Sequence, residues 1–189
     1  MNVSFDEVFN NVIENMHHFT PKEKEYSKLS NYKEILDNII DEVVDEVFDN
    51  LSSCEYTHNI FNENNEDEFK KDFKKWIGSF FEISNNDELT EFYKNVVKRG
   101  IKYVEKDFSP EYLSAILIMV GDRINEKLKE NLGDNSCEII EILDDLLKRI
   151  ALLNVASYMN FESKTLESIG VNQNLKKNAV KLGIKKMGL

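Results

Sequence analysis

Apolar residues recur every three or four positions along most of this chain. That spacing places side chains on one face of an α-helix and leaves polar residues on the other face. The longest such stretch runs from Asn31 to Leu51, where Asp and Glu fill the positions between the apolar ones. The same pattern predicts helices over residues 4–16, 67–83, 110–132 and about 136–160, and between the polar breaks at 84–88 and 109–110.

Residues that start and stop helices agree with these boundaries. Residues 4–7 have the spacing of a capping box, and Pro110 suits the first turn of a helix, where its missing N–H costs nothing. Thr20-Pro21 gives another start signal, and Gly133 stands where glycine commonly ends a helix. The last segment is predicted to be only weakly helical because glycines interrupt it at positions 170, 183 and 188.

Strand patterns do not compete with this interpretation. The sequence has neither sustained alternation of apolar and polar residues nor a glycine-containing hairpin turn between apolar runs. A length of 189 residues suits one ordinary domain with a full core. We therefore expect an all-α fold of seven or eight helices, with residues 1–160 as the domain and 161–189 as a lysine-rich tail or connector.

The formal charge of −11 is unevenly spread along the chain. Residues 161–189 hold six lysines and two glutamates, a net charge of +4, so the rest of the chain carries −15. A surface this acidic repels phosphate backbones and anionic lipid headgroups. Nucleic acid is therefore not an expected partner.

The cysteines and the apolar runs indicate a cytoplasmic protein. Cys54 and Cys137 are isolated and have no CxxC spacing, which argues against a disulfide framework or a zinc site. The most apolar run, residues 112–121, is half the length of about 20 residues that crosses a bilayer. The N-terminus has acidic residues where a signal peptide has basic ones.

Known catalytic motifs are missing from the sequence. It contains no phosphate-binding glycine loop, nucleophile elbow, HExxH pair or EF-hand loop. The carboxylate runs at 37–49 and 141–145 alternate with apolar residues at helical spacing, which is typical of a solvated helix face. We expect a protein without enzymatic activity.

The stretch around Tyr103 carries a resemblance to a known family. Gly100 precedes Tyr103 by three residues, and Pro110 follows it by seven and opens the next helix. Upstream, Trp76 and Phe80 form a W-x-x-x-F pair before a short polar loop. This arrangement, over residues 4 to about 160, resembles the sensor globins, the family of globin-coupled sensors and protoglobins. The helix at 4–16 resembles the family's N-terminal extension.

The resemblance implies that Tyr103 stands where the family has its haem-iron histidine. Tyrosinate is the proximal haem ligand in catalases, but a phenol with a pKa near 10 needs a positive charge or the metal to hold its anion. Arg99 and Lys106 share the helical face of Tyr103 and are candidates for that charge. The alternative is that Tyr103 is an ordinary aromatic residue in a vacated haem pocket.

The other metal-ligating side chains are three histidines, His17, His18 and His58, which we expect at surface or capping positions. Phe48 is the implied distal residue, where haem-binding members often carry a tyrosine. The side chains expected to line or border a pocket with Tyr103 are Phe48, Phe73, Trp76, Phe80, Tyr93, Val97 and Tyr112.

The function implied by the resemblance is that of a sensor domain in signal transduction. Haem is one expected cofactor, and an apolar ligand such as a fatty acyl chain is the alternative for a haem-free member. A helical module that docks a protein partner without any pocket also remains open. We expect a homodimer through residues 136–160 and part of 110–132, and a downstream signalling protein as a further partner.

Overall fold

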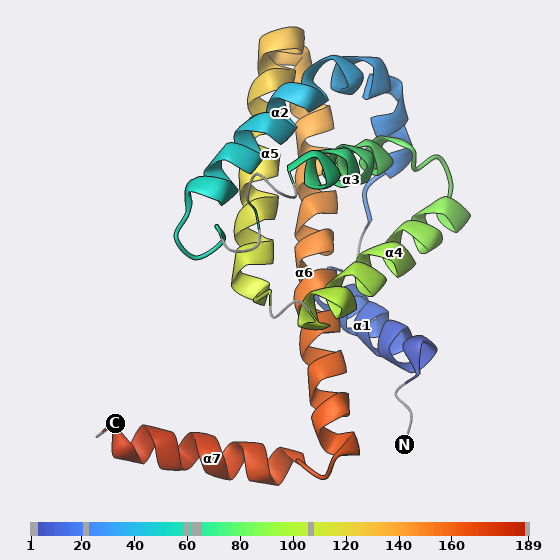
Figure 1. Ribbon diagram of the computed structural model, residues 1–189. Coiled ribbons are helices and arrows are strands. Elements are labelled where there is room, and N and C mark those ends of the chain that lie inside the picture. The colour runs from blue at the N-terminus through green and yellow to red at the C-terminus, as the bar shows by residue number, and fades with distance from the viewer. Residues whose placement is uncertain (1–3, 21–22, 59–60, 62–65, 106–107, 188–189) are drawn as a thin grey trace.

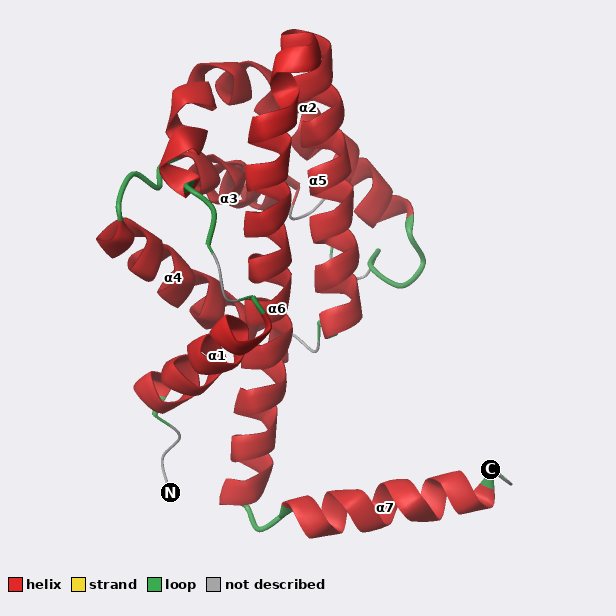
Figure 2. Cartoon of the chain, turned by 180° about the vertical axis from the view of Figure 1, so that it is seen from behind, coloured by secondary structure: helices red, strands yellow, loops and turns green. Residues whose placement is uncertain are grey.

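The chain folds into helices joined by short connections (Figure 1). The computed structural model describes all residues except 1–3, 21–22, 59–60, 62–65, 106–107 and 188–189. No described residue lies in a strand (Figure 2), so the all-α prediction is confirmed. In chain order the elements are α1 (Phe5–Phe19), the 3-10 helix η1 (Tyr26–Tyr32), α2 (Lys33–Ser53), α3 (Glu66–Gly78), η2 (Ser79–Phe81), α4 (Asn86–Glu105), α5 (Pro110–Leu132), η3 (Gly133–Ser136), α6 (Cys137–Ser168) and α7 (Gln173–Lys186).

Helix α6 is the axis of the molecule (Figure 1). Helices α1, α4 and α5 all pack directly against it, and α2 packs on α5 and α3. The lower end of α6 extends past α1 and α4, and α7 leaves it at a steep angle, away from the other helices (Figures 1 and 2).

The predicted helix starts are close to the observed ones, whereas two predictions near the C-terminus are wrong. The helix expected to end near Asn160 continues to Ser168, and the segment expected to be weakly helical forms α7. Gly170 has a φ of 93°, which a glycine adopts readily, and it ends α6. The start signal at Thr20-Pro21 falls partly outside the described residues, and the following described residues enter η1.

Helices α4 and α6 approach each other closely where they cross. Gly100 is buried in this crossing, and a Cβ atom added there would lie 2.0 Å from Oγ of Ser157 and 2.9 Å from the backbone oxygen of Asn154. The glycine therefore lets the α4 backbone reach the surface of α6. This contact fixes the position of the half of α4 that carries Tyr103.

A buried arginine ties the first connection of the chain to α6. The Arg149 side chain is 0% exposed, and its Nε donates to Oδ2 of Asp145 at 3.0 Å. Its Nη1 donates to Oγ1 of Thr20 at 3.1 Å, and the Tyr26 hydroxyl donates to Asp145 at 2.5 Å. Burial raises the pKa of Tyr26, so this hydroxyl stays protonated and keeps donating.

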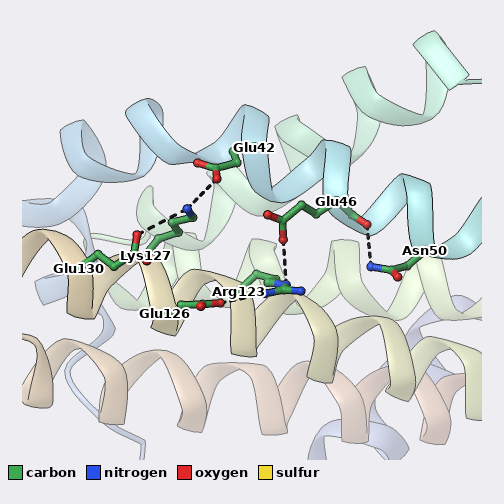
Figure 3. A network of polar contacts seen from close by, with 7 residues as sticks. All are labelled: Glu42, Glu46, Asn50, Arg123, Glu126, Lys127 and Glu130. Carbon is green, nitrogen blue, oxygen red and sulfur yellow. Dashed lines mark hydrogen bonds and ion pairs between the residues drawn. The ribbon is translucent and has the colours of Figure 1, made fainter.

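Ion pairs join α2 to α5 (Figure 3). Nζ of Lys127 lies 2.6 Å from Oε1 of Glu42, and Nε of Arg123 lies 2.8 Å from Oε2 of Glu46. In each pair at least one side chain is more than 40% exposed, so solvent screens the attraction and each pair contributes at most about 1 kcal/mol. The arrangement accounts for the acidic stripe on α2 as a paired, solvated face, as the sequence pattern predicted.

Cys54 and Cys137 are both free cysteines. Within the described part of the chain, no helix is both long and apolar enough to cross a bilayer.

Candidate functional site

A cavity of about 810 Å³ opens between α3 and α4. Side chains of α3 and α4 form its walls, and α5 and α6 contribute residues to its floor. Its volume is typical of sites that bind small molecules or cofactors. The apolar lining consists of Phe61, Phe69, Phe73, Trp76, Ile83, Phe92, Val96, Leu113, Ile116 and Leu117.

The wall on α3 is a continuous row of aromatic rings. Phe69, Phe73 and Trp76 lie four and three residues apart, so they share one helix face. Phe69 and Phe73 are stacked with centroids 4.9 Å apart, and the Trp76 ring lies 5.2 Å from Phe73. A fully buried Phe80 supports this row by meeting Trp76 edge-on at 4.9 Å. Phe69, Phe73 and Trp76 of this row line the cavity.

Tyr103 lies on the opposite wall, two residues before the end of α4. It is half-buried, and its ring lies 5.4 Å from the ring of Phe108. Burial raises the pKa of Tyr103, and the nearby positive charge of Arg99 opposes that shift without reversing it. Tyr103 is therefore a neutral phenol at neutral pH, and a bound metal would have to displace its proton.

Arg99 connects the two walls. It lies one helical turn before Tyr103, and its guanidinium carbon is 4.9 Å from the centroid of the Trp76 ring on α3. This distance is within the range of a cation–π interaction. Arg99 thus contacts the aromatic wall while its charge acts on the phenol of Tyr103.

The floor contains one buried polar side chain from α6. Asn154 lines the cavity, is 2% exposed, and has an Oδ1 atom without a hydrogen-bond partner in the described structure. A buried carbonyl oxygen without a partner costs about 1–3 kcal/mol. The cavity can therefore offer a hydrogen bond to a polar group of a ligand.

The structure brings three of the eight predicted site residues together at this cavity. Phe73, Trp76 and Tyr103 line it. Phe48 and Phe80 lie behind the aromatic row, with the Phe48 ring 5.5 Å from Phe69.

Three other predicted residues face elsewhere. Val97 is fully buried in the core, on the face of α4 that meets α6. The Tyr93 hydroxyl donates to Oε1 of Glu23 at 3.1 Å, and Tyr112 packs between Tyr56 and Phe108. None of the three is among the side chains that line the cavity, and Tyr112 contacts Phe108, which in turn packs on Tyr103.

The histidines do not reach the cavity. His17 and His18 are exposed at the end of α1, and Nδ1 of His58 lies 2.7 Å from the backbone oxygen of Ser52. The surface and capping roles expected for them agree with these positions. Over the described residues, no three His, Cys, Asp or Glu side chains gather closely enough to hold a metal ion. Lys106, the second candidate cation, lies outside the described residues.

Sequence reasoning missed the Phe61, Phe69 and Phe92 side chains and the polar Asn154. Phe69 belongs to the same stripe as Phe73 and Trp76, so its spacing could have assigned it to the site. Phe61 lies in a connection, where helical periodicity gives no signal. Asn154 looks like an ordinary polar position until α6 is placed against α4.

The cavity fits haem in size and in donor chemistry. Aromatic side chains of α3 and Tyr103 of α4 line one space of cofactor size, and tyrosinate is a known haem ligand. Tyr103 would hold the iron, and Phe73 and Trp76 would contact the porphyrin face.

Comparisons with known proteins agree with this architecture. The family model described as Protoglobin matches residues 11–173. The chain is 62% identical over 189 residues to the uncharacterized protein MJ1356 of Methanocaldococcus jannaschii, with all of both chains covered. It is 35% identical over 193 residues to the uncharacterized protein MJ1461 of the same organism, covering 98% of this chain and 97% of that protein. No solved structure matches the chain significantly.

Proposed function

The chain belongs to the protoglobin family and has its globin-like fold, and from that premise we propose that it is a regulatory globin that binds haem through Tyr103. The observation that carries the proposal is the cavity between α3 and α4, which is lined by the aromatic side chains of α3 and by Tyr103 of α4. When bound, haem supplies an iron centre that exchanges ligands or electrons. A hard phenolate ligand favours the ferric state of that centre.

The surroundings of Tyr103 act on its phenol in opposite directions. Burial raises the pKa of the Tyr103 phenol, so its proton leaves only when a metal ion replaces it. Arg99 stabilises the resulting anion through its positive charge. The aromatic rings of Phe73 and Trp76 exclude water from the opposite side of the cavity.

Signalling would proceed through the crossing of α4 and α6. Tyr103 and Gly100 lie on the same helix, and Gly100 touches α6 beside Asn154, which itself lines the cavity. A ligand that binds one packing of these helices more tightly shifts the population toward it. The role proposed here is regulatory rather than catalytic, in the cytoplasm.

A homodimer is part of this proposal. Ile118 on α5 and Met159 on α6 are 66% and 60% exposed, and Leu152 on α6 is 39% exposed. A partner helix pair laid on these side chains would bury them. The same helices then carry both the dimer contact and the contact with α4.

The test is a titration of haemin into the wild-type protein, Tyr103→Phe and Tyr112→Phe. Tyr112→Phe is the matched control, because Tyr112 does not line the cavity. We expect a Soret band that saturates at one haem per chain in the wild type and in the control. In Tyr103→Phe the band changes shape or is lost.

A haem-free globin module that docks a protein partner is the second candidate. It is favoured by the neutral state of Tyr103, since a phenol is a poor iron ligand before it loses its proton. A wild-type protein without a saturable Soret band would contradict haem binding and leave this candidate in place.

A further inference from the structure

Helix α7 lies outside the packed part of the molecule. It leaves α6 at a steep angle and is the outermost helix at that end, with the other helices on one side of it (Figures 1 and 2). No other described helix packs extensively on α7, and most of its described residues are exposed. Its side chains serve neither the core nor the cavity, so they are available to a surface outside this chain.

The apolar residues of α7 cover about half of its circumference. They form two neighbouring stripes with i, i+4, i+7 spacing: Leu175, Ala179 and Leu182, and Val180, Ile184 and Met187, the last at the C-cap. Gly183 lies between the stripes and has no side chain to interrupt them. The five larger apolar side chains are between 44% and 74% exposed. A groove in a protein takes up a single stripe of anchors, whereas a face this wide fits a flat apolar layer.

The remaining face of α7 is basic. Lys177, Lys181 and Lys185 follow one another at i, i+4 and i+8, opposite the apolar face. Lys176 and Lys186 share the apolar face but stand in its first and last turns, where long side chains can extend past the ends of that face to polar groups. Neither α7 nor the chain that follows it contains an aspartate or glutamate. A helix with an apolar half and a lysine half is suited to the interface of an anionic lipid layer.

The acidic remainder of the chain opposes such a contact only weakly. At about 1.5 Å per residue, the 14 residues of α7 extend roughly 21 Å away from α6. Charges that lie farther apart than about 8 Å are largely screened at physiological salt. A flat surface can meet α7 along its length while the other helices stay on the far side (Figure 1). The fold thereby separates a basic contact surface from the acidic body.

We propose that α7 docks the protein reversibly on an anionic lipid surface, with its apolar face at the boundary between headgroups and acyl chains and its lysines close to the anionic headgroups. Each lysine near such a surface raises the partition coefficient about fivefold. Burial of the apolar face adds to this attraction. At 14 residues α7 is too short to cross a bilayer, so the contact is peripheral. The proposal uses neither the cavity nor Tyr103 and is independent of haem binding.

Co-sedimentation with vesicles tests the proposal on the intact protein. One set of vesicles contains phosphatidylcholine and phosphatidylglycerol in equal parts, and the other contains phosphatidylcholine alone. We expect the wild type to pellet with the anionic vesicles and to stay in solution with the neutral ones. Added salt should release it, because salt screens the lysines. Deletion of residues 173–189 should abolish pelleting.

The basic face is tested by a triple variant with a matched control. Lys177→Gln/Lys181→Gln/Lys185→Gln should lower the partition coefficient roughly a hundredfold, since each lysine contributes about fivefold. The control removes the same charge from the body: Lys24→Gln/Lys74→Gln/Lys94→Gln. Each lysine of the control pairs with a carboxylate and none lies in α7, so this variant should bind vesicles as the wild type does.

The apolar face is tested by Leu182→Gln/Ile184→Gln. This variant replaces one side chain of each stripe and keeps every charge. It should lose most of its binding to the anionic vesicles, because the wide apolar face no longer fits the lipid layer. Unchanged binding would mean that the lysines act alone, and would overturn the proposed docking of the apolar face.

Other outcomes overturn the proposal as a whole. Absence of pelleting with anionic vesicles would do so, as would pelleting that persists after deletion of residues 173–189. If vesicles bind nothing and the deletion turns a dimer into a monomer in analytical ultracentrifugation, α7 docks on the acidic body of a second copy instead. A failed haemin titration would contradict the proposed function alone, because vesicle binding does not involve the cavity.

Discussion

Replacement of Gly100 by alanine adds a methyl group where α4 packs tightly against α6. The new Cβ atom would lie 2.0 Å from Oγ of Ser157, 2.9 Å from the backbone oxygen of Asn154 and 3.2 Å from its Cα. Rotation of the Ser157 side chain can relieve the first clash. The other two involve backbone atoms, so the helices themselves must separate.

The expected cost follows from those distances. Atoms in contact prefer separations of about 3.5–4.0 Å, so the backbones must move apart by roughly half an ångström or more. Overpacking of this kind costs about 1–3 kcal/mol. Alanine recovers up to about 1 kcal/mol through its higher helix propensity. We expect Gly100→Ala to lower the free energy of unfolding by about 1–2 kcal/mol.

Urea unfolding of Gly100→Ala and Gly78→Ala measures this effect against a matched control. Gly78 is the last residue of α3, has a helical φ of −54°, and has open space where its Cβ would lie. Gly78→Ala should therefore be as stable as the wild type or more stable, by up to about 1 kcal/mol. Only Gly100→Ala should also change haemin affinity, because it moves the helix that carries Tyr103. Equal stability of the two variants would refute the packing argument.

Three further results are expected. Arg149→Leu should lose about 3–5 kcal/mol in urea unfolding, because it leaves the carboxylate of Asp145 without its buried cation; a loss below 1 kcal/mol would mean that the network is not structural. Burial raises the pKa of Tyr26 and of Tyr93, so the folded state keeps both protons at a pH where the unfolded chain, with a tyrosine pKa of about 10, loses them. The free energy of unfolding should therefore be constant below about pH 10 and fall as the pH rises further. An absorbance signal of tyrosinate from these residues that rises before the protein unfolds would contradict this. Deletion of residues 173–189 should remove the α7 contribution to the helical CD signal and shift Tm by less than about 2 °C, because α7 extends away from the other helices; a larger loss would show that α7 supports the core.

The sequence predicted the helices well because most of them bury one face. Periodicity predicted a helix over residues 31–51, and α2 spans Lys33–Ser53, because its buried positions recur at helical spacing from Leu36 to Leu51. The same signal fades after Asn160, where α6 leaves the core, and the prediction ended the helix there. No helix breaker stands before Gly170, so the backbone hydrogen bonds simply continue to Ser168.

The cavity was harder to predict because α4 is buried on two sides. Tyr93, Val97 and Gly100 face the core and α6, whereas Phe92 and Tyr103 face the cavity. Neighbouring positions on a helix differ by about 100° in direction, so an error of one residue exchanges the two faces. Spacing alone cannot distinguish them, because both sets of residues are apolar or aromatic at helical intervals.

The length of α6 beyond its crossing with α4 turns it into a lever. Fourteen residues separate Asn154 from Ser168 at the end of α6, and at a rise of about 1.5 Å per residue they form an arm of roughly 21 Å. A tilt of about 5° at the crossing displaces the far end by roughly 2 Å, since the displacement scales with the arm. A change at Gly100 smaller than an atomic radius is thereby multiplied before it reaches α7, the five-lysine helix at the tip of the arm.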